Sequence, residues 1–550
     1  MQQPRPARPP RLVVIEGQRD TPPETRLSPT AYGVAICFAV ALGALVRASF
    51  VLSQDFPLSD GGLFFVMAED LQHSGYALPA FTSYNASDIP FAYPPLGIYA
   101  GALVADLTPL DMLQTLRILP LTASVLSILA FHLLARSLIR SQLAVVVSVF
   151  AFALLPRAFY WMIMGGGLTR SFGLLFALLA LHQVVVMCRS GGARHAIAAG
   201  VFAGLTALSH LEWAWFVAFS TPILIAGHGL RREHLRDACI AGVVAVALAA
   251  PWWGTVIAQH GLSPFLAASQ TASQTSANPL VSLLSFHFTD EPLFPLLATL
   301  GLIGLIAEVA GRRYLLPGWF LACLVLEPTA FGTVAMVPLA LLVACGVTGV
   351  MLPMLEGPAR SEHPGRILPP RWLPAAAAVA AVFYTLLSAA LTSPKTLSAM
   401  TSDERDAMAW AAANTPSSSR FLVVTGDRWA IDRTSEWFPA LTGRVSVATP
   451  QGYEFVPGRA LEQKIEAYIA AQRCASSDAG CLDAWRARFG EAYAFDYIYL
   501  PRLEPRNFST LDKDECCAAL RAALLRDPGY RTVFDGPGAT IISVRPKDAN

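Results

Sequence analysis

Long apolar runs alternate with short polar turns along most of the chain. Charge-free stretches of about twenty residues recur, and a helix of that length crosses the hydrocarbon core of a bilayer. About eleven such spans are predicted, at 30–52, 112–135, 141–159, 168–188, 195–209, 211–229, 238–258, 291–310, 314–328, 330–354 and 373–392. The pattern therefore predicts a polytopic α-helical membrane protein, with residues 30–392 as its transmembrane domain.

Residues 53–111 lie between the first two spans and are predicted to form a large loop outside the membrane. The apolar segment 96–107 has only about twelve residues, which reach about 18 Å, so a re-entrant or interfacial helix is expected there. Earlier in the loop, the segment LFFVMAEDLQHSG predicts an amphipathic helix lying on the outer membrane surface. Its apolar face holds Leu63, Val66, Met67 and Leu71.

The distribution of arginines predicts the orientation of the spans. Basic residues collect in cytoplasmic loops. If segment 96–107 does not span, one side of the membrane receives Arg136, Arg140, Arg189, Arg194, Arg231, Arg232, Arg236, Arg312 and Arg313. This side is predicted to be the cytoplasm, and the Pro- and Arg-rich residues 1–29 are predicted to be a disordered cytoplasmic leader.

The opposite side then receives the loop 53–111, residues 160–167, the turns around His210 and Glu327, and residues 259–290. The last of these is long, small and polar, which is typical of a lid over a site. We expect a multi-pass protein of the plasma (inner) membrane, whose C-terminal region is extracellular or periplasmic.

The C-terminal residues 395–550 have a different pattern, with charges, turns and short apolar strands. SRFLVVTGD and FDYIYLPR are predicted to be buried strands, while SDERDAMAWAAANT and RALEQKIEAYIAAQR are predicted to be helices. Together they predict an external soluble α/β domain. Neither GxGxxG nor a P-loop occurs in it, so nothing indicates nucleotide binding. The segment TSEWFPALTGR, with Trp437, Phe438 and Arg444, is either a binding surface or a contact with the first loop.

Composition agrees with this picture, since 54% of the residues are hydrophobic, 14% are charged and the mean hydropathy is +0.47. The net charge of +1 says nothing about partners, and no nucleic-acid partner is expected. Five of the nine cysteines lie in the spans. The remaining four allow two disulfides in the external domain, with a pairing that the sequence leaves open: Cys474, Cys481, Cys516 and Cys517. Their spacing does not predict a metal site.

The candidate chemistry gathers at the outer face. Asp60 opens the first loop, and an ionised carboxylate can accept a proton from a hydroxyl group. Arg170 follows the flexible turn MGGGLT, where backbone amides and a helix start can face an anion. Arg117 is a second candidate, because arginine binds phosphate oxygens bidentately. Arg47 and Arg157 are expected instead to extend their charged ends to the membrane interface.

The order of these features resembles the GT-C superfamily of membrane glycosyltransferases. The shared features are a first span, an Asp at the start of the external loop, surface helices, the Tyr-Pro-Pro-Leu segment, many spans and an external tail. The protein O-mannosyltransferases, the aminoarabinose transferases of lipid A and the lipopolysaccharide-core-type bacterial glycosyltransferases are members. The resemblance implies a polyprenyl-phosphate sugar as donor and assigns the role of catalytic base to Asp60.

The chain departs from that pattern at two positions. Many members have an acidic pair where Asp60 is followed here by Gly61. PWWG at 251–254 has the tryptophans of an oligosaccharyltransferase motif without its Asp, so the chain is not identified with those enzymes.

The sequence thus predicts a glycosyltransferase that moves a sugar from a polyprenyl phosphate to a lipid, glycan or protein hydroxyl at the outer face of the membrane. Asp60 is the predicted base, and Arg170 and Arg117 are the predicted phosphate-binding residues. Candidate substrate contacts are Glu69, Asp70, Tyr93, His210 and Glu212. Membrane lipids are expected partners; a divalent cation is allowed, although no ligand set predicts one.

Structural roles compete with several of these assignments. Asp60 can be a helix N-cap, Glu69 and Asp70 a solvated helix face, and His210 and Glu212 a capped turn. Two other functions also fit a polytopic chain: a transporter or flippase of lipid-linked sugars, and a non-catalytic scaffold that acts through its tail.

Overall fold

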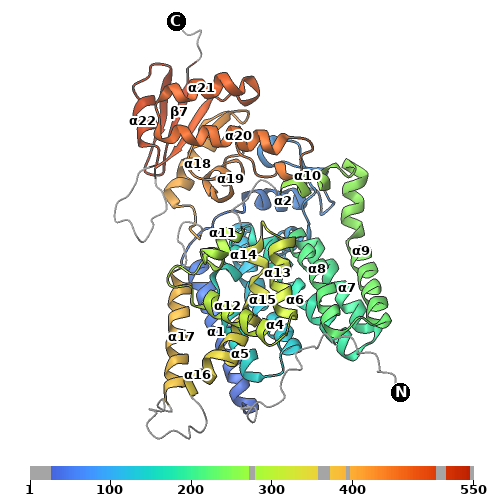
Figure 1. The fold of residues 1–550 in the computed structure, drawn as a ribbon. Helices are drawn as coiled ribbons and strands as arrows, with labels where there is room; N and C mark the ends of the chain where they lie inside the picture. The colour runs from blue at the N-terminus through green and yellow to red at the C-terminus, as the bar shows by residue number, and fades with distance from the viewer. Residues whose placement is uncertain (1–26, 272–278, 357–371, 392–396, 503–515, 546–550) are drawn as a thin grey trace, which may run out of the picture.

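The computed structural model describes residues 27–271, 279–356, 372–391, 397–502 and 516–545. A bundle of long helices forms one end of the molecule, and a domain of mixed helices and strands lies across the other end (Figure 1). Each predicted span coincides with a helix. These are α1 (Pro29–Leu52), α4 (Met112–Leu138), α5 (Gln142–Leu154), α6 (Gly167–Ser190), α7 (Ala193–Ser209), α8 (Leu211–His228), α9 (Arg232–His260), α12 (Leu296–Ala310), α13 (Leu315–Leu326), α15 (Met336–Gly346) and α17 (Leu373–Ala390).

Six helices in the described ranges are long and apolar enough to cross a membrane, and the bent pair Gln142–Leu154 and Pro156–Met162 would make a seventh. The apolar helices support a multi-pass membrane protein, as predicted from the sequence. The number of eleven spans stays a prediction, because α12 and α13 are shorter than a full crossing requires.

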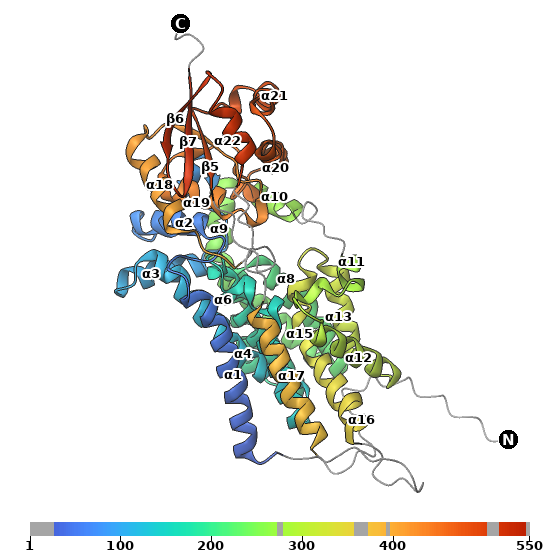
Figure 2. The same ribbon diagram turned by 90° about the vertical axis from the view of Figure 1, so that its left-hand side faces the viewer.

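The first loop contains α2 (Gly62–His73), a short hairpin of β1 (Phe81–Thr82) and β2 (Ile89–Pro90), and α3 (Leu96–Leu107). The helix α3 has the length predicted from the sequence and lies across the end of the bundle (Figure 2). The apolar face predicted for α2 is confirmed, since Leu63, Val66, Met67 and Leu71 are buried. In addition, α19 of the C-terminal domain packs against α2.

The C-terminal domain is an α/β domain, as predicted. Its five-stranded sheet has the order β4 (Val445–Ser446), β3 (Arg420–Val423), β5 (Tyr497–Pro501), β7 (Ala539–Val544) and β6 (Tyr530–Asp535). The first three strands are parallel to one another. The strand β7 runs antiparallel to its neighbours β5 and β6. Figure 2 shows α18 (Ser402–Asn414) and α19 (Arg433–Thr442) on one side of the sheet, and α20 (Ala460–Gln472), α21 (Ala479–Phe489) and α22 (Ala518–Leu524) on the other.

The two faces of this sheet pack into different cores, because successive residues of a strand point to opposite faces. Phe421 and Val423 of β3 join the core that continues into the helical bundle. Leu422 of β3 and Ile498 of β5 join a separate core beneath α20, α21 and α22. The domain is therefore continuous with the bundle on one face only. Its four cysteines form two disulfides, Cys474–Cys481 and Cys516–Cys517.

The prediction that Arg47 extends to the membrane interface is wrong. Its side chain is 1% exposed and lies inside the bundle. The guanidinium donates to the carbonyls of Gly43 at 2.9 Å and Ala153 at 2.7 Å and to Ser124 Oγ at 3.0 Å. These acceptors come from α1, α4 and α5, so Arg47 links three helices. Hydrogen bonds to carbonyls partly replace the water that a buried cation loses.

Candidate active site

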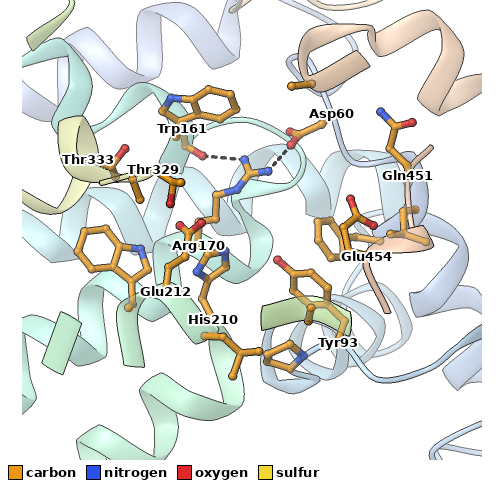
Figure 3. Close-up of a pocket in the computed structure, with 18 of the residues that line it drawn as sticks. Asp60, Tyr93, Trp161, Arg170, His210, Glu212, Thr329, Thr333, Gln451 and Glu454 are labelled. Carbon is orange, nitrogen blue, oxygen red and sulfur yellow. Dashed lines mark hydrogen bonds and ion pairs between the residues drawn. The ribbon is translucent and has the colours of Figure 1, made fainter. Parts of the chain in front are cut away.

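A cavity of about 430 Å³ lies where the bundle, the first loop and the C-terminal domain meet. A cavity of this size is typical of a small-molecule site. The polar and charged side chains that line it are Asp60, Tyr93, Arg157, Arg170, His210, Glu212, Thr329, Thr333, Glu436, Gln451 and Glu454. Figure 3 shows Gln451 and Glu454 across the cavity from Thr329 and Thr333, with Arg170 and His210 between them.

Asp60 does not cap a helix but faces the glycine turn before α6. Its Oδ1 accepts a hydrogen bond from the backbone N–H of Gly166 at 3.0 Å, and its Oδ2 pairs with the guanidinium of Arg170. A Cβ on Gly166 would lie only 2.5 Å from Asp60 Oδ2. The glycines of MGGGLT therefore permit the close approach of the two segments.

The turn that holds Asp60 continues through Gly61, whose φ of +133° favours glycine. A Cβ on Gly61 would meet the Gly165 backbone at 3.0 Å. The Gly61 N–H donates to Glu436 Oε1 at 3.0 Å, and Trp437 Nε1 donates to the carbonyl of Ser59 at 2.9 Å. The C-terminal domain thus forms hydrogen bonds with the backbone of the residues on both sides of Asp60.

Arg170 lies in the first turn of α6. Besides pairing with Asp60, it donates to the carbonyl of Trp161 at 3.3 Å and lies over the Trp161 ring at 5.3 Å from the centroid (Figure 3). Its side chain is 20% exposed, and that of Asp60 is 15% exposed. The pair is therefore largely withdrawn from solvent while still lining the cavity.

Arg157 also lines the cavity, instead of reaching the membrane interface as predicted. It pairs with Asp290 at 2.8 Å and bonds to the hydroxyl of Tyr160, and the same hydroxyl donates to Asp290 at 2.5 Å. This cluster joins the segment before α6 to the end of the 259–290 loop.

Burial changes the acidity of the groups that the C-terminal domain and the first loop bring to the cavity. Burial, together with the nearby charge of Asp60, raises the pKa of Glu436 to about 8. Burial also raises the pKa of Glu454 and that of Tyr93, the latter to about 12. Glu436 therefore holds its proton to a higher pH than an exposed Glu does.

Five of the predicted site residues meet in this cavity, and three do not. Asp60, Tyr93, Arg170, His210 and Glu212 all line it. Glu69 is not among the residues that line it.

The other two predicted residues outside the cavity, Arg117 and Asp70, stabilise the first loop through hydrogen bonds. Arg117 bonds to the carbonyls of Val51 at 3.3 Å and Gln54 at the end of α1. Asp70 accepts hydrogen bonds at 2.6 Å from the hydroxyls of Thr82 and Ser83, which holds the β1 segment.

Three further residues of the cavity were not predicted from the sequence as site residues: Glu436, Gln451 and Glu454. Glu436 directly precedes Trp437, within the segment that had been left open between a binding surface and a contact with the first loop. Trp437 and Phe438 are fully buried, and Trp437 packs on Phe56 at 4.7 Å between ring centroids, so the segment contacts the loop. Arg444 donates to the carbonyls of Ala412 and Thr415. Nothing in the sequence around Gln451 and Glu454 signals a site.

No group of three or more His, Cys, Asp or Glu side chains in the described ranges of the chain is arranged to hold a metal ion. Gly61 occupies the position at which an acidic pair would place a second carboxylate.

No protein-family model and no curated protein sequence matches the chain. Solved structures do match. ArnT from Cupriavidus metallidurans, bound to undecaprenyl phosphate, is 14% identical, with a TM-score of 0.51 over 93% of this chain and 98% of its own. The oligosaccharyltransferase AglB from Archaeoglobus fulgidus, in complex with a dolichol-phosphate, is 13% identical, with a TM-score of 0.52 over 84% and 69%. Arabinofuranosyltransferase AftD from Mycobacteria is 18% identical, with a TM-score of 0.54 over 96% of this chain but only 40% of its own.

All three of these proteins are GT-C glycosyltransferases. At such low identity the likeness establishes the fold. The chain therefore has the GT-C fold that was predicted from the sequence.

Proposed function

We propose that the protein is a glycosyltransferase that moves a sugar from a polyprenyl-phosphate donor to a hydroxyl group of a lipid, glycan or protein. The observation that carries this proposal is the Asp60–Arg170 pair in the wall of the cavity. It places a proton acceptor beside a guanidinium that can bind phosphate. Two of the similar structures hold a polyprenyl phosphate, dolichol-phosphate in AglB and undecaprenyl phosphate in ArnT, which supports a donor of this class.

In the proposed reaction, the acceptor oxygen attacks the anomeric carbon as the bond from that carbon to the phosphate oxygen breaks. The acceptor proton passes to the carboxylate of Asp60, and the polyprenyl phosphate leaves with the bonding electron pair. Arg170 stabilises the negative charge that grows on the phosphate oxygens. Both oxygens of Asp60 already accept one hydrogen bond, and a carboxylate has about four lone-pair sites, so it can still accept the proton.

The pairing of Asp60 with Arg170 also links binding of the donor to the role of Asp60 as the base. A phosphate that binds Arg170 competes with Asp60 for the same guanidinium. As this competition weakens the ion pair, an oxygen of the Asp60 carboxylate becomes available to the acceptor hydroxyl. Arg117 is not needed for this proposal, since its guanidinium bonds to the carbonyls of Val51 and Gln54.

The cavity lies at the end of the bundle that faces the C-terminal domain (Figure 1). With the arginine-rich loops in the cytoplasm, this end lies at the outer face of the membrane. The 259–290 loop is proposed as a lid, and Ala268 of α10 (Ser263–Thr271) lines the cavity. Residues 272–278 of that loop lie outside the described ranges.

The test is sugar transfer by the purified protein in nanodiscs, with a panel of radiolabelled polyprenyl-phosphate sugars and a membrane extract as acceptor. Asp60→Asn is expected to lower transfer about 10²- to 10⁴-fold, the usual contribution of a general base. Donor binding is expected to persist. Asp106→Asn is the matched control, because Asp106 lies in the same loop, on α3, and outside the cavity.

The outcomes separate the three candidate functions. Transfer that survives in Asp60→Asn would remove Asp60 from the mechanism. A wild-type protein that neither binds nor transfers any donor would favour the scaffold. Movement of lipid-linked sugars across the membrane without transfer would favour the flippase.

A further inference from the structure

The C-terminal domain forms one wall of the cavity, mainly through the segments that follow two neighbouring parallel strands. Trp429 and Ala430 follow β3, and Gln451, Glu454 and Phe455 follow β4. The chain leaves β3 for α19 on one face of the sheet and leaves β4 for α20 on the other face (Figure 2). Beyond the carboxyl ends of parallel strands is where open α/β sheets commonly bind ligands.

Gln451 has a hydrogen-bonding atom with no partner at this wall. The residue is 9% exposed, and its Nε2 donates to the backbone carbonyl of Trp429 at 2.9 Å. A carbonyl only accepts, so this bond fixes which end of the amide faces Trp429. The opposite atom, Oε1, is buried and has no hydrogen-bond partner within the described part of the chain. A buried acceptor of this kind is costly to leave without a donor.

Glu454 lies beside Gln451 at the same wall (Figure 3). Its carboxylate, like the free amide oxygen, accepts hydrogen bonds when ionised. Trp429 and Phe455 add aromatic surface, and Phe455 packs edge-on against Tyr93 at 5.6 Å between ring centroids. Among the described residues of the C-terminal domain that line the cavity, none is a Lys or Arg. This wall is therefore suited to a neutral ligand that donates hydrogen bonds.

We propose that Gln451 and Glu454, with the aromatic rings of Trp429 and Phe455, form a subsite for a sugar ring that carries neighbouring hydroxyl groups. Adjacent hydroxyls donate to Gln451 Oε1 and to the Glu454 carboxylate, and the C–H face of the ring packs on the aromatic surface. Glu454 in its ionised form would repel a phosphate or carboxylate. The proposal rests on the proposed function, and the sugar is either that of the donor or that of a glycan acceptor.

The experiment uses the full chain in nanodiscs with two probes, undecaprenyl phosphate and the polyprenyl-phosphate monosaccharide that supports transfer. The variants are Gln451→Met and Glu454→Met; the second leaves the bond between Gln451 and Trp429 in place. Gln463→Met, exposed on α20, is the matched control. Thermal unfolding of each variant confirms that it is folded.

Each variant is expected to weaken binding of the sugar about 3- to 10-fold, the effect of one or two lost hydrogen bonds. If the donor sugar occupies the subsite, the Kd of the polyprenyl-phosphate monosaccharide rises while that of undecaprenyl phosphate is unchanged. If a glycan acceptor occupies it, both donor-side Kd values are unchanged and the KM for the acceptor rises. Either pattern supports the subsite.

Two results overturn the proposal, and they are distinguishable. Normal transfer, with every Kd and KM unchanged in both variants, removes the subsite and leaves the proposed function intact. Failure of the wild-type protein to bind undecaprenyl phosphate removes the proposed function and the subsite with it.

Discussion

The two walls of the cavity differ in the charge they present. The wall from the helical bundle carries the guanidinium groups of Arg157 and Arg170 together with the side chain of Glu212. The described residues of the opposite wall, from the C-terminal domain, supply Glu436, Gln451 and Glu454 and no cation. Under the proposed function, the first wall would attract an anionic lipid phosphate, and hydroxyl groups would find acceptors at the second. A cavity with two such walls would hold a charged lipid and a neutral sugar in fixed positions relative to each other.

The two walls meet at Asp60, and each contributes a contact there. Its carboxylate is held by Arg170 from the bundle, while the adjoining Gly61 N–H is held by Glu436 from the C-terminal domain. Neither wall alone orients this residue. The following predictions test how far each wall contributes.

Removing the contact that joins the C-terminal domain to the first loop is expected to have the largest effect on stability. Trp437 is fully buried, packs on Phe56 and Phe65 and donates to Ser59. Trp437→Ala should lower the free energy of unfolding by about 3–5 kcal/mol, the usual cost of deleting a buried aromatic ring. Chemical unfolding in detergent measures this, and sugar transfer should fall with it. The comparison variant is Trp410→Ala, because Trp410 on α18 is half-buried and contacts Phe534 of β6. An equal loss in Trp410→Ala would argue against a special role for the contact with Ser59.

Neutralising the bundle wall should selectively weaken binding of phosphate. A hydrogen bond to a charged group contributes about 1.5–3 kcal/mol, so Arg170→Gln should raise the Kd for undecaprenyl phosphate about 10- to 150-fold. Arg170→Lys should have a smaller effect, because lysine keeps the charge but loses the planar fork. Titration of the lipid in nanodiscs measures both values. Arg232→Gln, exposed at the start of α9, should leave the Kd unchanged. Unaltered binding in Arg170→Gln would place the phosphate elsewhere.

On the wall from the C-terminal domain, Glu436 should make the stability of the protein depend on pH. Glu436 has a pKa of about 8 in the folded protein, above its ordinary 4.5, because it is buried beside Asp60. Between these values the folded chain holds a proton that the unfolded chain releases, so Glu436 makes the protein less stable as pH rises. Glu436→Gln removes this dependence.

The stability difference between Glu436→Gln and the wild type should therefore be small below about pH 4.5, grow in favour of the variant up to about pH 8 and stay constant above it. Thermal unfolding across this pH range measures the difference. A variant whose advantage does not change with pH would show that Glu436 ionises normally in the folded protein.

The smallest effect is expected from the exposed ion pair between the loop and the domain. Arg405 pairs with Asp55, whose side chain is 73% exposed, and lies over the Phe56 ring at 5.2 Å. Exposed pairs contribute about 0–1 kcal/mol, so Arg405→Gln should change the free energy of unfolding by no more than about 1 kcal/mol. The same unfolding measurement in high salt should reduce even this difference. A larger loss would mean that this pair, rather than Trp437, holds the domain on the loop.

Much of the architecture was predictable because it is encoded locally. A helix in lipid satisfies its own backbone hydrogen bonds and needs only a continuous apolar run, so the positions of the long helices follow from the sequence. The apolar face of α2 and the strands Arg420–Val423 and Tyr497–Pro501 follow from equally local periodicities. Asp60 and Arg170 could be singled out because each has an unusual neighbourhood, a loop entry in one case and a glycine turn in the other.

Assembly of the site could not be predicted in the same way. Asp60 and Arg170 are 110 residues apart, and Trp437 and the carbonyl of Ser59 are 378 apart, so no pattern along the chain links them. Arg117 has the same charge as Arg170, yet the fold turns it to the end of α1. Gln451 and Glu454 became cavity residues only because α19 docks on α2 and carries the ends of β3 and β4 over the bundle. The sequence by itself determined the helices, the strands and the candidate acid and base types, since these depend on near neighbours. Which of those side chains share a cavity was decided only by tertiary packing, since that depends on contacts between distant segments.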